Sequence, residues 1–114
     1  MNIYNSSNNN LIAADVKVAQ NFITRSIGLL SKTSLKQGEG LIIKPCCSIH
    51  TFFMKFPIDV LFVNRQNCIV ALYQNVQKNK IVPFHLSSLY VIELPAGQIS
   101  EKNIEKYDII RVDE

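Results

Sequence analysis

Apolar and polar residues alternate along much of this chain, which is the pattern of strands that bury one face of a sheet. In the stretch 11–19, Val16 and Val18 alternate with Asp15 and Lys17, and this predicts a first strand. Further short apolar or β-branched runs, bounded by glycine, proline or polar turns, predict strands over 40–44, 49–56, 58–63, 68–73, 89–94 and 109–112. The sequence therefore predicts about seven closely spaced strands.

The clearest pairing between two of these strands involves a polar turn. Residues 64–67 read Asn-Arg-Gln-Asn and separate two apolar runs. Asparagine tolerates the left-handed backbone conformation that tight turns need. We therefore predict that 58–63 and 68–73 form an antiparallel hairpin.

Two short segments have helical features. Ile23, Ile27 and Leu30 recur at intervals of four and three residues, and Ser100 precedes a single expected helical turn over 101–106. Many short strands with one or two short helices are typical of a mainly β (α+β) fold. We therefore expect a single compact antiparallel β-sandwich or barrel.

Length and composition fit one domain. The chain has 114 residues, of which 47% are hydrophobic, and this suffices for a single core but not for two. Residues 1–10 are rich in asparagine and serine, which predicts a flexible N-terminal lead-in. Residues 11–114 are then expected to form the globular domain.

Charge and apolar patterning narrow the possible partners and locations. Charged residues make up 18% of the chain, and the net charge of +3 is spread over lysines without a dense cluster, so there is no clear nucleic-acid signal. The sequence does not open like a secretory signal, and no apolar run approaches the roughly 20 residues of a membrane helix. We therefore expect a cytoplasmic protein without a membrane segment, in which the three cysteines are reduced.

Residues 45–64 combine a strongly apolar run with the polar side chains of His50, Thr51, Lys55 and Asp59. Alternation puts Asp59 at the start of a face that otherwise requires burial, and it puts Glu93 at the end of another apolar face. A buried carboxylate must become protonated or find a cation, because removing its charge from water costs several kcal/mol. We therefore predict a partly buried polar cluster that contains Lys55, Asp59 and Glu93, with His50 and Thr51 nearby.

Five segments of the chain follow one another in a distinctive order. They read Arg-Ser-Ile-Gly-Leu-Leu (25–30), Gly-Leu-Ile-Ile (40–43), Ser-Ile-His-Thr-Phe-Phe-Met-Lys (48–55), Ile-Asp-Val-Leu-Phe (58–62) and Glu-Leu-Pro-Ala-Gly (93–97). This order resembles the family called domain of unknown function 192 (DUF 192). The resemblance runs from about Val16 to about Val112, which is nearly the whole chain.

The resemblance implies a small, mainly β, sandwich-like prokaryotic domain with no established biochemical activity to transfer. The family's polar motif positions fall here on Arg25, His50, Thr51, Lys55, Asp59 and Glu93. Arg25 is added by resemblance alone, because helical spacing turns it away from the apolar stripe. In one departure, Tyr107 stands before Asp108 where the family usually has glycine. Tyrosine rarely adopts a positive φ, so the turn there need not keep the family's geometry.

Other chemistries find little support in the sequence. The potential metal ligands are Cys46, Cys47, His50, Cys68 and His85, but adjacent cysteines point apart on a strand and no C-x-x-C or H-x-x-x-H spacing occurs. A nucleophile and base pair made of Cys47 and His50 would lie on opposite faces of a strand. Phosphate loops, nucleophile elbows and dinucleotide fingerprints are missing from the sequence. We therefore expect no metal and no cofactor.

Three functions remain open for the polar cluster, and the sequence names no catalytic residue, ligand or protein partner. The first is a noncatalytic binding or accessory domain for a small polar ligand or short peptide, with Lys80 and His85 flanking the opening. The second is a small hydrolase in which Asp59 or Glu93 acts as general base together with His50. The third is a protein-interaction domain in which the cluster only holds the fold together.

Overall fold

The structure, a computed structural model, describes residues 1–19, 34–52 and 54–114. In these ranges the chain forms ten strands and one short helix. In chain order they are β1 (Asn2–Asn5), β2 (Asn10–Ala13), β3 (Asp15–Ala19), β4 (Glu39–Ile43), β5 (Ile49–His50), β6 (Ile58–Asn64), β7 (Ile69–Val76), β8 (Ile81–Val82), β9 (Ser88–Pro95), α2 (Gln98–Glu101) and β10 (Ile110–Asp113).

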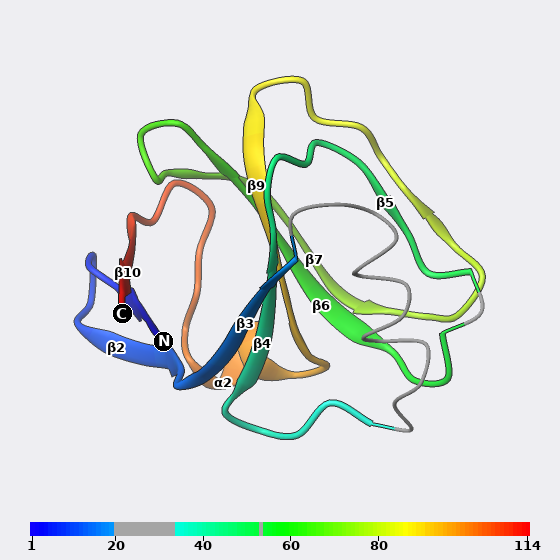
Figure 1. Ribbon diagram of the computed structural model, residues 1–114, viewed down its shortest axis with the longest axis horizontal. Helices are drawn as coiled ribbons and strands as arrows, with labels where there is room; N and C mark the ends of the chain where they lie inside the picture. Colours follow the sequence, from blue (N-terminus) through cyan, green and yellow to red (C-terminus); the bar gives the residue numbers. More distant parts are fainter. Residues whose placement is uncertain (20–33, 53) are drawn as a thin grey trace.

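The strands form a layered, sandwich-like arrangement, which confirms the mainly β fold expected from the sequence. A five-stranded sheet has the order β3-β4-β9-β6-β7, a three-stranded sheet has the order β10-β1-β2, and β5 pairs with β8. Figure 1 shows the five-stranded sheet between the strands of the three-stranded sheet on the left and β5 on the right. The β3–β4 pairing is parallel, whereas β9 pairs antiparallel with both β4 and β6. The described strands make open sheets rather than a closed barrel.

The two faces of the five-stranded sheet bury separate cores. The first core, toward the three-stranded sheet, includes Ile3, Ile12, Leu61, Ile92, Leu94 and Ile110. The second core, toward β5 and β8, includes Ile49, Val60, Phe62, Val82 and Val91. Residues directly opposite each other on paired strands share a face. Leu61 accordingly lies opposite Ile92, and Phe62 lies opposite Val91.

The hairpin predicted from the Asn-Arg-Gln-Asn turn is confirmed as β6–β7. The side-chain oxygen of Asn64 accepts hydrogen bonds from the backbone N–H groups of Gln66 (3.0 Å) and Cys68 (2.9 Å). Asn67 adopts a φ of 61°, the left-handed conformation that asparagine tolerates. The turn therefore forms through the side-chain chemistry that its asparagines supply.

The N-terminal residues 1–10, predicted as a flexible lead-in, contain strand β1 and the first residue of β2. Strand β1 is the central strand of the three-stranded sheet, and it pairs with β10 on one side and β2 on the other. Ile3 and Asn5 in β1 are fully buried. The asparagine-rich segment supplies a hairpin turn, with Asn9 at a φ of 61°. The predicted strand 11–19 is accordingly divided between β2 and β3.

The strand predicted over 49–56 is wrong beyond its first two residues. Strand β5 covers Ile49 and His50 alone, and it pairs with β8. The chain then turns, because the carbonyl of Thr51 accepts hydrogen bonds from the backbone N–H groups of Met54 (3.2 Å) and Asn79 (3.1 Å). The period-two assignment of side chains to faces therefore does not apply after His50.

The helical predictions have different outcomes. The helix expected around 23–30 lies outside the described residues. Helix α2 begins at Gln98, three residues before the turn expected after Ser100, and Gly97 is its N-cap with a φ of 95°. The backbone N–H groups of Gly97 and Ile99 donate to the carboxylate of Asp59. The Asp59 carboxylate of β6, rather than the Ser100 side chain, therefore accepts hydrogen bonds from the backbone at the start of this helix.

Candidate functional site

Asp59 is completely buried near the start of β6. Its Oδ1 accepts a hydrogen bond from the backbone N–H of Asn75 (2.8 Å), and its Oδ2 accepts from those of Gly97 (3.1 Å) and Ile99 (2.8 Å). These three charge-assisted bonds compensate for the loss of hydration of the carboxylate. Asp59 thus ties β6 to the end of β7 and to the turn before α2.

Glu93 lies on the opposite face of the five-stranded sheet from Asp59. In the register of β6 and β9, Asp59 is opposite Leu94, whereas Glu93 is opposite Val60. Because opposite residues share a face, Asp59 belongs to the face of the first core and Glu93 to that of the second. Glu93 is also completely buried. The structure therefore separates the two carboxylates that we predicted to share one cluster.

Lys55 does not supply the expected counter-charge. Its side chain is exposed, and within residues 1–19, 34–52 and 54–114 the ion pair found is the one between Arg111 and Asp113. The predicted cluster of Lys55, Asp59 and Glu93 is therefore not formed among the described residues: no ion pair there joins Lys55 to either carboxylate, and backbone N–H groups satisfy Asp59. Arg25, the site residue suggested by the resemblance alone, lies outside the described residues. A ligand-binding role for these residues stays a prediction.

Thr51 is a fully buried clamp between two segments of the chain. Its hydroxyl donates to the carbonyl of Gln77 (2.6 Å) and accepts from the backbone N–H of Lys80 (2.9 Å). Its own backbone N–H donates to the carbonyl of Lys80 (2.8 Å). Thr51 therefore fixes the loop between β7 and β8 against the chain that follows β5.

His50 is a predicted site residue that borders an open pocket. The pocket has a volume of about 520 Å³. Its wall is mainly apolar and is formed by Ile43, Pro45, Cys46, Cys47, Ser48, Ile49, His50, Phe52 and Ile81. The His50 ring stacks on Phe52 with the ring centroids 4.8 Å apart, and its Nδ1 accepts the backbone N–H of Phe52 (3.3 Å). This hydrogen bond places the proton of the neutral ring on Nε2.

Two cysteines contribute polarisable side chains to the same pocket. Cys46 and Cys47 are half-buried free thiols, and the Cys46 thiol donates to the carbonyl of Ser48 (3.0 Å). Cys68 lies elsewhere, immediately before β7, where its backbone forms an isolated antiparallel β-bridge with Ile109. Over the described ranges, no three histidine, cysteine, aspartate or glutamate side chains gather in a way that could hold a metal ion.

Lys80 and His85, predicted to flank the opening, are not among the residues that form the pocket wall. His85 Nε2 lies 2.6 Å from the hydroxyl oxygen of Tyr73, and the His85 ring packs on Phe62 with centroids 4.7 Å apart. Its backbone N–H donates to the carbonyl of Cys47 (2.9 Å). His85 therefore anchors its loop to the segment before β5, while Lys80 is exposed next to Thr51.

The sequence analysis missed a group of exposed apolar side chains beside the pocket. The exposed fractions of Phe52, Ile81, Phe84 and Leu86 are 36%, 75%, 60% and 82%. We call these four residues the apolar rim. A signal is present in the sequence, because three large apolar residues stand within 81–86 around Pro83, where the chain neither alternates nor forms a long strand. Apolar side chains this exposed mark interaction sites when they gather in one patch.

The geometry gives no support to the hydrolase hypothesis. A general base must come within hydrogen-bonding reach of the proton that it removes. Asp59 has no exposed surface, and both of its oxygens accept backbone hydrogen bonds. Glu93 has no exposed surface either, and it lies on the other face of the sheet. The remaining partner of that hypothesis, His50, borders the pocket without either carboxylate.

Comparison with known proteins identifies relatives of uncharacterised function. The family model DUF192, described as "Uncharacterized ACR, COG1430", matches residues 3–112. A UPF0127 protein from Thermococcus gammatolerans is 28% identical over 115 residues, which cover 97% of this chain and 74% of that protein. A UPF0127 protein from Thermococcus kodakarensis is 27% identical over 99 residues, which cover 83% of this chain and 62% of that protein.

Two solved structures share the fold. A protein of unknown function from Novosphingobium aromaticivorans superposes with a TM-score of 0.81 at 19% identity, covering 97% of this chain and 82% of that one. A protein from Sinorhizobium meliloti, described as a candidate transcription regulator, superposes with a TM-score of 0.80 at 18% identity, covering 96% and 89%. At these identities the likeness concerns the fold alone. In the described part of this chain, no helix has the length and apolar character to cross a membrane.

Proposed function

We propose that this chain, which belongs to the DUF192 family of uncharacterised proteins, is a noncatalytic binding domain whose ligand occupies the pocket beside β5. The observation that carries the proposal is the open, mainly apolar pocket of about 520 Å³. This volume is in the range of small-molecule sites, which are usually apolar clefts with a few polar groups. Here His50 and Ser48 are polar groups of that kind.

The ligand class that fits best is a small amphipathic anion with an apolar body. Residues 40–92 contain Lys44, Lys55, Arg65, Lys78 and Lys80, whereas Asp59 is their one acidic residue. Asp59 is fully buried, so the charged surface of this segment is positive. A positive surface around a cleft raises the local concentration of anions. The apolar wall would take the hydrophobic part of the ligand, and the positive surroundings would favour its anionic group.

The buried polar residues are better explained as parts of the framework than as ligand contacts. In the described structure every buried side-chain nitrogen or oxygen has a hydrogen-bond partner. The side chains of Asp59 and Thr51 form hydrogen bonds with backbone groups of neighbouring loops. A ligand that reached them would have to break these bonds, and each broken bond would leave a buried group unsatisfied.

Octanoate and octylammonium are suitable probes, because they have the same chain length and opposite charges. We expect octanoate to bind with a Kd of roughly several millimolar, since drug-sized ligands gain about 0.3 kcal/mol per non-hydrogen atom. Octylammonium should bind more weakly. The affinities are measured by titrating each compound into 15N-labelled protein and following the amide chemical shifts.

Two aspartate substitutions separate the pocket from the rest of the surface. Ile81→Asp places a negative charge at the pocket wall and should reduce octanoate affinity by about tenfold. Leu11→Asp is the matched control, because Leu11 is 41% exposed on β2 and is not part of the pocket wall. Equal affinities of octanoate for the two variants would contradict the proposal, as would saturable octanoate shifts centred on Asp59.

A further inference from the structure

We propose that the apolar rim docks this domain on an anionic lipid surface, with Phe84 and Leu86 entering the bilayer interface and nearby lysines facing the head groups. This surface is additional to the ligand pocket, because Phe84 and Leu86 do not belong to the pocket wall. It overlaps the pocket at Phe52 and Ile81, which also form part of the pocket wall, so Leu86 is a rim residue that distinguishes the two.

Two apolar side chains of the rim, those of Phe84 and Leu86, protrude from a loop that is held in place. The backbone N–H of His85 donates to the carbonyl of Cys47 (2.9 Å), and that of Ser88 donates to the carbonyl of His85 (3.0 Å). The His85 ring is also held by Tyr73, whose hydroxyl oxygen lies 2.6 Å from His85 Nε2. These contacts fix the middle of the loop, while Phe84 and Leu86 on either side of His85 keep 60% and 82% of their surface exposed. The loop thus presents apolar groups outward instead of folding them into the second core.

Lysines accompany the rim at short range along the chain. Lys78 and Lys80 are exposed and precede Ile81. Thr51, next to Phe52 of the rim, binds the backbone of Lys80, and the exposed Lys55 follows shortly after. An anionic lipid surface attracts such residues, and each lysine near it raises the affinity for the membrane about fivefold.

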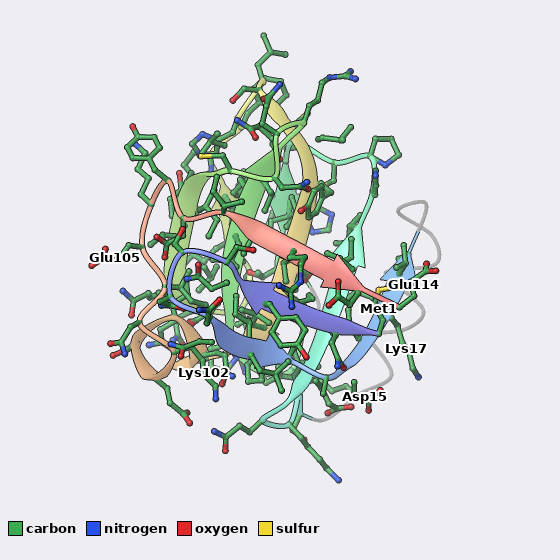
Figure 2. All side chains as sticks on the ribbon, turned by 90° about the vertical axis from the view of Figure 1, so that its left-hand side faces the viewer. Met1, Asp15, Lys17, Lys102, Glu105 and Glu114 are labelled. Atoms are coloured by element: carbon green, nitrogen blue, oxygen red, sulfur yellow. The ribbon has the colours of Figure 1, made fainter. Side chains whose placement is uncertain are left out.

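The charges elsewhere on the molecule are mixed in sign. Figure 2 looks onto the side of the three-stranded sheet, where the labelled charged residues are Asp15, Lys17, Lys102, Glu105 and Glu114. Figure 1 shows β5 on the side of the five-stranded sheet away from both chain termini. Residues 40–92, which carry the apolar rim and its lysines, have Asp59 as their one acidic residue. Asp59 is buried, so the charged side chains on the surface of this segment are positive, which suits contact with a negatively charged plane.

A bilayer fits this surface better than an acidic peptide strand does. Strands β5 and β8 have two residues each, and Pro83 directly after β8 has no backbone N–H to donate. A peptide added at this edge would gain few of the main-chain hydrogen bonds on which strand addition depends. A bilayer interface accepts protruding apolar side chains without such bonds and combines them with attraction between lysines and anionic lipids.

The test is flotation of the purified protein with vesicles of phosphatidylcholine, with and without phosphatidylglycerol, at low and high salt. We expect binding to the vesicles that contain phosphatidylglycerol, and loss of most of it at high salt. Leu86→Asp should reduce binding by about tenfold or more, whereas Leu11→Asp, the control on β2, should not. Lys78→Glu should reduce binding to anionic vesicles with little effect on the fold, because its side chain is exposed.

The outcomes also separate this proposal from the ligand pocket. Ser48→Trp fills the pocket and should weaken octanoate binding while vesicle binding persists. Leu86→Asp should weaken vesicle binding while octanoate binding persists. Absence of binding to anionic vesicles at low salt, or equal binding by Leu86→Asp and Leu11→Asp, would overturn the docking surface. Binding of soluble polyglutamate instead of vesicles would also overturn it and would indicate an acidic protein partner.

Discussion

Replacing Asp59 with asparagine tests whether this buried carboxylate holds the fold together. The substitution keeps the shape of the side chain but removes its charge and one of its two acceptor oxygens. Asp59 accepts hydrogen bonds from the backbone N–H groups of Asn75, Gly97 and Ile99. If the remaining oxygen faces Gly97 and Ile99, the new amide group faces the N–H of Asn75. Two donors then meet, and the hydrogen bond to Asn75 is lost.

The expected cost follows from these contacts. A buried N–H that loses its acceptor costs about 1–3 kcal/mol, and a hydrogen bond to a charged group is worth about twice a neutral one. One unsatisfied donor and two weakened bonds therefore lower the free energy of unfolding by about 4 kcal/mol. Domains of this size have roughly 5–15 kcal/mol in total. Asp59→Asn should thus lose a large part of the stability of the protein.

Urea unfolding at neutral pH measures this loss directly. The matched control is Asp15→Asn, because Asp15 is an exposed aspartate at the start of β3. We expect the control to remain within about 0.5 kcal/mol of the wild type. A loss below about 1 kcal/mol for Asp59→Asn, or equal losses in both variants, would refute the reasoning and return Asp59 to the candidates for ligand binding.

Three further predictions concern Thr51, Tyr107 and Tyr90. Thr51→Val removes the hydroxyl that binds Gln77 and Lys80 and should cost about 2 kcal/mol in urea unfolding; Thr51→Ser keeps both bonds, so an equal loss there would contradict the clamp. Tyr107 adopts a φ of 75°, so Tyr107→Gly should be more stable than Tyr107→Ala by about 1 kcal/mol, and equal thermal midpoints would argue against backbone strain. Burial raises the pKa of the Tyr90 phenol from 10.0 to about 12. The phenol therefore loses its proton at a lower pH in the unfolded chain than in the folded protein. The free energy of unfolding is unaffected by this group below pH 10 and falls as pH rises toward about 12. Relative to Tyr90→Phe, the wild type should lose roughly 2 kcal/mol across this range. Parallel urea curves for the two proteins across this window would contradict that assignment.

Local features of the fold could be predicted from the sequence because they depend on neighbouring residues. The β6–β7 hairpin follows from an asparagine turn whose side chain binds the backbone. The alternation in 58–63 correctly groups Asp59 with Leu61 and Val63, because both leucine and valine belong to the first core. Tyr107 shows the limit of such reasoning, since it adopts the positive φ that its residue type disfavours.

The candidate site could not be predicted in the same way, because it depends on how distant strands pair. Alternation shows which residues of one strand share a face, but the relation between two strands depends on their register. The register of β6 and β9 sets Asp59 and Glu93 on opposite faces. Similarly, the backbone N–H groups of Gly97 and Ile99 stabilise the Asp59 carboxylate, and the pattern of charged side chains along the sequence does not reveal backbone donors. A search for a cation therefore pointed to Lys55, which is exposed.

The irregular chain after β5 explains why the pocket was missed. Residues 49–56 have the apolar composition of a buried strand, yet Thr51 turns the chain by binding the loop before β8. This turn leaves Phe52 and Ile81 at a pocket wall instead of in a continuous sheet. The contacts responsible join residues that are far apart in sequence, so no local pattern reports them.

The measurement that tests the central claim most directly is an isotope-filtered NOE spectrum of the 13C-labelled protein in the presence of octanoate. If the pocket beside β5 is the binding site, the terminal methyl group of octanoate will show contacts with the methyl groups of Ile43, Ile49 and Ile81, which belong to the pocket wall. Contacts with Leu61 or Leu94 instead, which share the face of Asp59, would contradict the account and place the ligand in the region of the buried carboxylate.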